Sequence, residues 1–131
     1  DSGTHSKEKA IWASAGYDYE EVRESGGWYI EAGSGMGPTL VMAHEKNAYT
    51  LSDIGTFLYY QGDLALVPVV DSGDILLNVY SVIATTNTDK TEMANNLVEF
   101  LVSQEIQELI GEYGVEGYGR QLFTPCAGQD L

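Results

Sequence analysis

The chain has 131 residues, 44% of them hydrophobic, which is enough for one buried core and predicts a single domain or one lobe of a larger protein. Its 20 acidic and 6 basic residues give a formal net charge of −14. Nucleic acid and anionic membranes are therefore poor partners, because neither would meet a basic face.

The chain shows no signal peptide and no apolar run of about 18 residues, so we expect it to be soluble and not inserted in a membrane. The single cysteine, Cys126, excludes an internal disulfide and leaves open whether it pairs with a cysteine elsewhere.

The first half of the chain twice places small residues ahead of a helix. Ser2, Gly3 and Thr4 come before a helical run over residues 7–15, and the glycine-rich turn 33–39 comes before another helix that ends near residue 46. Between them we expect a loop with a short helical turn over 16–27 and a short strand over 28–32. Both turns therefore predict helix N-termini that present free backbone N–H groups.

The second half alternates apolar runs with helices. We expect strands at 48–51, 64–70 and 75–85, a helix over 54–60 capped by Ser52 and Asp53, and a turn at 71–74. Helical spacing then predicts two helices within 91–113. Asp89 or Thr91 would cap the first of them and Ser103 would start the second. This order favours an α/β fold with a mostly parallel sheet flanked by helices.

In such a sheet, ligands bind at the carboxyl ends of the strands, where the following helices begin. The hydroxyls of Ser2 and Thr4, with the N–H groups of residues 3 to 5, suit a tetrahedral oxyanion, because a helix N-terminus favours negative charge. The alternative is an ordinary N-cap with nothing bound. The glycine-rich turn has a similar alternative, a flexible loop, since it matches neither a Walker A motif nor a dinucleotide fingerprint.

Several spaced motifs resemble the tungstate-binding proteins of ABC importers. They cover nearly the whole chain and are Asp1-Ser2-Gly3-Thr4-His5 with Glu8 and Trp12, Trp28-Tyr29 with Glu31-Ala32-Gly33, Gly35-Met36-Gly37 with Thr39-Leu40, Ala48 to Asp53 with Gly55-Thr56, Leu76-Leu77-Asn78 with Tyr80, Val82 and Ile83, and Gly119 with Gln121-Leu122-Phe123. The resemblance implies a type II periplasmic-binding-protein fold, in which two α/β lobes close on tungstate or molybdate. It implies a solute-binding protein, not an enzyme, that delivers the anion to an ABC-type permease from a periplasmic, cell-surface or secreted location. No cofactor is implied.

The same resemblance implies a division of this chain. Residues 1–80 would form the second lobe of the oxyanion-binding protein, and residues 81–131 the crossing strand and the C-terminal helices that pack on a missing first lobe. The oxyanion-binding residues carried over are Ser2, Gly3, Thr4, Met36 and Gly37. Family members also carry an arginine and a Thr/Ser-rich loop that would lie before residue 1. Either the chain is a fragment, or another chain completes the site.

Other functions leave weaker signals. A sensory or regulatory domain of the same fold, which binds an oxyanion or another small ligand, is the main alternative. His5 and His44 lack further metal ligands at recognisable spacing, and Ser2 with His5 lacks the acid of a catalytic triad. We therefore expect no metal site beyond the metal of the oxyanion, and no catalytic residues.

Overall fold

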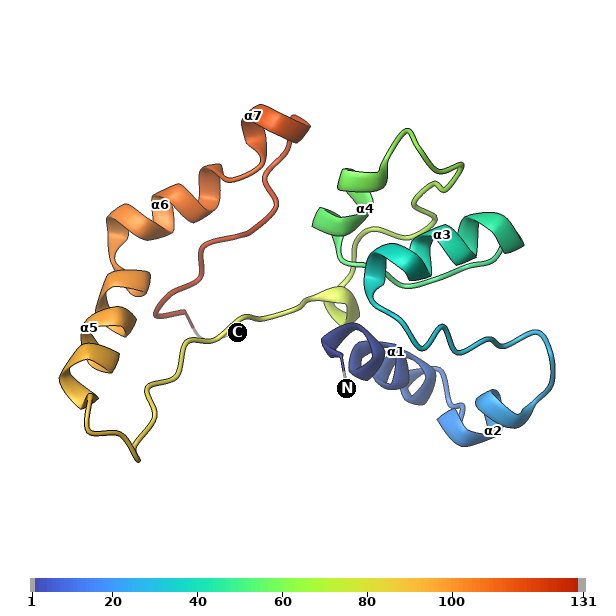
Figure 1. Ribbon diagram of the computed structural model, residues 1–131, viewed down its shortest axis with the longest axis horizontal. Helices are drawn as coiled ribbons and strands as arrows, with labels where there is room; N and C mark the ends of the chain where they lie inside the picture. The colour runs from blue at the N-terminus through green and yellow to red at the C-terminus, as the bar shows by residue number, and fades with distance from the viewer. Residues whose placement is uncertain (1, 130–131) are drawn as a thin grey trace. The chain divides into compact units, whose positions relative to one another are not determined.

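The computed structural model describes residues 2–129, so Asp1 of the first motif lies outside the described residues. The chain forms two compact units, one that ends at Leu77 and one that begins at Asn78. The helices of the first unit are α1 (Gly3–Ser14), α2 (Tyr19–Glu24), α3 (Met36–Lys46), α4 (Ile54–Tyr60) and the short 3₁₀ helix η1 (Asp74–Leu76), and those of the second are α5 (Thr91–Val102), α6 (Gln104–Glu112) and α7 (Val115–Tyr118) (Figure 1). The assignment of residues 1–80 and 81–131 to particular parts of a two-lobed protein stays a prediction.

Local capping explains most helix boundaries in the first unit. Ser2 caps α1 by accepting a hydrogen bond from the His5 N–H at 3.1 Å, and Asp53 caps α4 by accepting one from the Thr56 N–H at 2.8 Å. Asp18 caps α2, which is longer than the short helical turn expected there. Helix α3 ends at Asn47, whose left-handed conformation (φ 51°, ψ 46°) terminates the helix.

The buried core of the described chain is small and lies in the first unit. Leu40 and Ala43 on α3 and Val22 on α2 are the residues with less than a tenth of their surface exposed. Leu40 is only 2% exposed and is the most completely buried side chain. Helix α3 is therefore the element around which the first unit packs.

In the second unit, two consecutive helices meet at one residue. Ser103 ends α5 and starts α6, as the sequence predicts, but its hydroxyl donates to the Phe100 carbonyl at 2.7 Å and does not cap α6. The predicted caps of α5 are wrong, because Lys90 occupies the N-cap and Thr91 is already helical. The extended C-terminal segment returns along these helices, where Phe123 packs against Tyr80 and Tyr113.

The predicted parallel sheet does not form within residues 2–129. The only pairing there is an isolated bridge between Gln61 and Leu64, and the segments 28–32, 48–51, 64–70 and 75–85 contain no strand. Instead, most of their apolar side chains are exposed, among them Val67 at 77% and Ile83 at 81%. A strand needs a neighbouring strand for its backbone hydrogen bonds, and apolar β-forming residues alone do not provide one.

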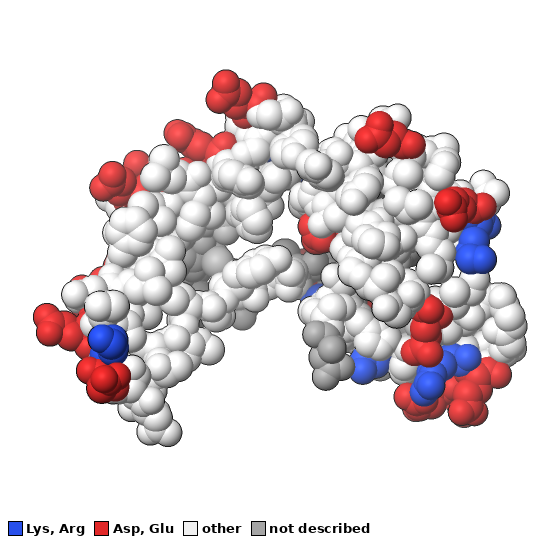
Figure 2. Space-filling view, viewed as in Figure 1, with Lys and Arg blue, Asp and Glu red and all other residues white. Residues whose placement is uncertain are grey.

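The surface of the described chain is predominantly acidic. Carboxylate groups are spread over the visible face of both units in Figure 2, whereas lysine and arginine groups are few. On α2, Arg23 pairs with Glu20 at 3.0 Å and with Glu31 at 3.1 Å. In the part of the chain that the structure describes, no helix has the length and apolar character needed to cross a bilayer.

Candidate functional site

The first predicted anion-binding turn forms the start of helix α1. Gly3 and Thr4 are its first two helical residues, so their N–H groups have no carbonyl of the same helix to bind. The Ser2 oxygen accepts from the His5 N–H, which leaves the hydroxyl hydrogen of Ser2 able to donate outward. The Ser2 and Thr4 side chains thus lie at a helix end together with two free backbone donors.

The second predicted turn forms the start of helix α3. Gly35 is the N-cap and has no side chain, so the N–H groups of Met36 and Gly37 receive no side-chain cap. The next residue, Pro38, has no N–H, and the Thr39 N–H is already bonded to the Gly35 carbonyl at 3.1 Å. The N–H groups without a partner at this turn are therefore those of Met36 and Gly37, the two residues that the family resemblance implies as donors.

The start of α3 is closely packed against α4. A Cβ atom added at Gly37 would lie 2.5 Å from the hydroxyl oxygen of Tyr60, so any other residue at this position would require the Tyr60 side chain to shift. This contact was not predicted from the sequence, because it joins residues on two separate helices and no local pattern reports it. Gly37 therefore has a packing role in addition to any role as a donor.

Behind the start of α1, the carboxylate of Glu8 collects three side-chain donors. His5 Nδ1 lies 3.0 Å from Oε2, while the Tyr29 hydroxyl donates to Oε1 at 2.7 Å and Trp12 Nε1 donates to the same oxygen at 3.3 Å. The Tyr29 hydroxyl also lies 3.3 Å from that of Tyr19. Burial, together with the hydrogen bonds to Tyr19 and Glu8, raises the pKa of Tyr29 far above its usual range. This cluster fixes the orientation of the first turn of α1 relative to the loop that follows α2.

Sequence reasoning identified Glu8, Trp12 and Tyr29 only as motif residues, without a role. The signal that links His5, Glu8 and Trp12 is their helical spacing, since residues three and four apart share one face of a helix. The link to Tyr29 is not local and needs the structure. In Figure 1 the amino ends of α1 and α3 both lie toward the left-hand side of the first unit. Lys7 on α1 also donates to the carbonyl of Leu77, the residue after η1.

The two histidines have different environments, and neither lies in a metal cluster. His44 accepts a hydrogen bond from the Ala65 N–H at 3.1 Å, while His5 is bonded to Glu8. Across residues 2–129 no group of three histidine, cysteine or acidic side chains is placed to hold a metal ion.

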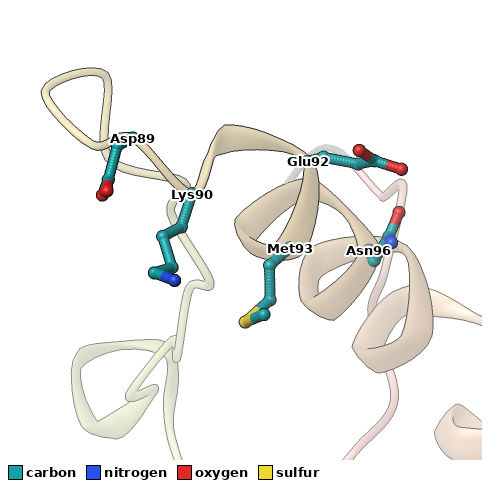
Figure 3. Close-up of a pocket in the computed structure, with 5 residues that line it drawn as sticks. All are labelled: Asp89, Lys90, Glu92, Met93 and Asn96. Carbon is teal, nitrogen blue, oxygen red and sulfur yellow. The ribbon is translucent and has the colours of Figure 1, made fainter.

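A separate hollow of about 400 Å³ lies at the start of α5, in the second unit. Figure 3 shows Lys90 and Met93 extending in the same direction, with Glu92 and Asn96 on the other side of the helix. Its lining contains the carboxylates of Asp89 and Glu92 against one lysine, which is unfavourable for an anion. None of the predicted oxyanion-binding residues lines it.

Comparison with known proteins gives related sequences over nearly the whole chain. The chain is 44% identical over 134 residues to the tungstate-binding protein TupA of Peptoclostridium acidaminophilum, an alignment that covers 98% of this chain and 45% of that protein. Nearly the whole chain is therefore similar to part of a tungstate-binding protein. It is also 43% identical to an ABC transporter anion-binding protein of Haloferax volcanii, over 97% of this chain and 38% of the relative. With TupA of Campylobacter jejuni the identity is 35%, over 86% of this chain and 43% of that protein.

The resemblance inferred from the motifs is thus confirmed, and it concerns less than half of each of these relatives. No protein-family model matches the chain. No solved structure matches it either.

Proposed function

We propose that this chain is part of an extracytoplasmic solute-binding protein that captures tungstate or molybdate and delivers it to an ABC-type permease. The observation that carries the proposal is the identity of 44% with a tungstate-binding protein over 98% of the chain. The relatives are named as binding proteins, one of them of an ABC transporter, which favours transport over a sensory role and over catalysis.

The geometry of the two helix starts supports an oxyanion as the ligand. Ser2, Gly3 and Thr4 on α1, and Met36 and Gly37 on α3, provide hydroxyl and N–H groups that donate hydrogen bonds. Tungstate is fully ionised near neutral pH and offers only acceptor oxygens, so donor-only groups suit it better than species that also need an acceptor. The net charge of −14 opposes the approach of an anion, but the Debye length of about 8 Å at physiological ionic strength limits that repulsion.

The complete protein would supply the partner strands and the first lobe that residues 2–129 do not contain. The chain spans less than half the length of its relatives, and its apolar segments 64–70 and 75–85 are exposed. We infer that these segments join a sheet in the longer protein, as expected for a type II binding-protein lobe, and that a first lobe completes the anion site. Closure of two lobes would then bury the anion between them.

Replacement of Thr4 by valine in the full-length protein tests the proposed site. Valine preserves the shape of the side chain and removes the hydroxyl, so we expect tungstate affinity to fall by about 10- to 100-fold while the apo melting temperature stays unchanged. Isothermal titration calorimetry with tungstate, molybdate, sulfate and phosphate measures the effect. Thr86→Val is the matched control, because Thr86 is exposed and lies in the second unit.

Replacement of Ser2 by alanine removes a proposed ligand donor and a helix cap at the same time. This change removes the N-cap of α1, so it should lower both the free energy of unfolding, by about 1 kcal/mol, and the affinity for tungstate. If the unsubstituted protein shows no heat of binding and no rise in melting temperature with tungstate, the proposed function is wrong.

A further inference from the structure

The hydroxyl of Tyr60 occupies a position next to the amino end of helix α3. It lies 2.5 Å from where a Cβ atom of Gly37 would be, and therefore at most about 4 Å from the Gly37 Cα, given a carbon–carbon bond of about 1.5 Å. The ring of Tyr60 fills the rest of that space, with its Cζ atom 3.0 Å from the same point. Glycine at this position leaves room for the hydroxyl.

The direction of this position matters for function. In an α-helix every Cα–Cβ bond tilts toward the N-terminus, so the place left empty by Gly37 lies on the amino side of its Cα. The free N–H groups of Met36 and Gly37 point toward the same end of the helix. The Tyr60 hydroxyl, at most about 4 Å from the Gly37 Cα, therefore lies near the amino end of α3, the end at which an anion would bind these two N–H groups.

We propose that Tyr60 is a further ligand-binding residue, whose hydroxyl donates a hydrogen bond to the oxyanion held at the start of α3. This inference rests on the function proposed above and adds a donor from α4 to the donors of α1 and α3. Like the other donors it is neutral, so it does not depend on a cationic side chain.

The environment of the hydroxyl agrees with this role. Among residues 2–129 the Tyr60 hydroxyl makes no hydrogen bond, and because no buried side-chain nitrogen or oxygen there lacks a partner, this hydroxyl is accessible to solvent and to a ligand. The neighbouring Tyr59, whose ring packs edge-on against Tyr60 at 5.3 Å, is 72% exposed. A hydroxyl that only filled space would be replaceable by hydrogen with no effect on ligand binding.

The test compares three forms of the full-length protein by isothermal titration calorimetry with tungstate. Tyr60→Phe should raise the dissociation constant by about 10- to 100-fold, which is the effect of losing one hydrogen bond to a charged group. Its apo melting temperature should match that of the unsubstituted protein, because the hydroxyl bonds no other described residue. Tyr59→Phe, the matched control, should bind tungstate as the unsubstituted protein does.

A second measurement detects contact between Tyr60 and tungstate in a protein that keeps Tyr60. With fluorotyrosine incorporated throughout, the ¹⁹F resonance assigned to Tyr60 by its loss in Tyr60→Phe should shift on addition of tungstate, and that of Tyr59 should not. Equal affinities for Tyr60→Phe and the unsubstituted protein, or an unmoved Tyr60 resonance at saturation, overturn the inference alone. Failure of the unsubstituted protein to bind tungstate overturns the inference together with the proposed function.

Discussion

At the scale of single residues, Glu8 has the largest share of side-chain contacts near the candidate site. Its two carboxylate oxygens accept hydrogen bonds from His5, Trp12 and Tyr29. His5 and Trp12 lie on α1, and Tyr29 lies in the loop after α2. A hydrogen bond to a charged acceptor is stronger than one between neutral groups, and its loss leaves the donors without a partner. Glu8 thus connects the first helix to the loop after α2.

Replacement of Glu8 by alanine should therefore destabilise the protein. We expect the free energy of unfolding to fall by about 1–3 kcal/mol, since three donors lose their acceptor at a half-buried position. Urea denaturation of the full-length protein measures it. Glu24→Ala removes an exposed carboxylate at the end of α2 and should change stability by less than about 0.5 kcal/mol. Equal effects of the two changes would show that the Glu8 contacts do not stabilise the fold.

At the scale of elements, α1, α2 and the following loop are joined by aromatic packing. His5 on α1 meets Tyr19 on α2 edge-on at 5.2 Å, and Trp12 meets Trp28 at 6.3 Å. Tyr29 packs against both Tyr19 and Trp28, and burial with its hydrogen bonds raises the pKa of its hydroxyl. The junction of these elements therefore contains a group that titrates differently in the folded and unfolded chain.

This difference predicts a loss of stability in alkali. The Tyr29 phenol of the folded chain keeps its proton at a pH where the unfolded phenol, with a pKa of about 10, has lost it. The unfolded chain then binds fewer protons than the folded one, so the free energy of unfolding should fall as the pH rises above about 10. Urea denaturation at pH 8 to 11 measures this slope. Tyr29→Phe should reduce the slope, and an unchanged slope would contradict the assignment to Tyr29.

The elements also show which structure could be predicted from the sequence. Helix α4 spans residues 54–60 as predicted, because its signal, the capping carboxylate of Asp53, is local. The predicted strands are missing from the described chain, because no partner strand is available there. The residues of a strand do not show whether a partner is available, so the sequence could not predict this. The first turns of α1 and α3 could be predicted because their signals are local. The contact of Tyr60 with Gly37 joins two helices and could not be predicted.

At the scale of the whole molecule, the chain buries little of its apolar surface. Three of residues 2–129 form its core, while Val67, Val69 and Val70 are each more than 70% exposed. Exposed apolar runs of this kind are typical of surfaces that another segment covers. This chain spans less than half of its relatives' length, and under the proposed function the additional chain covers these runs.

Hydrogen exchange tests whether the complete protein covers these runs. The backbone amides of residues 64–70 should exchange at least about tenfold more slowly in the full-length protein than in the 131-residue chain, since strand pairing would protect them. The amides of α4 give an internal reference, because their hydrogen bonds lie within one helix. Equal exchange of residues 64–70 in both forms would contradict the inferred sheet.

The two ends of α3 differ in a way that links folding to ligand binding. Its carboxyl end is closed by Asn47, whose N–H bonds the His44 carbonyl, whereas its amino end has no side-chain cap. An anion at that end would itself serve as the N-cap, a contact that contributes about 1 kcal/mol when a side chain makes it. The first turn of α3 would then fray less in the occupied protein than in the empty one. Part of the binding energy would thus appear as order in the helix on which the core is built.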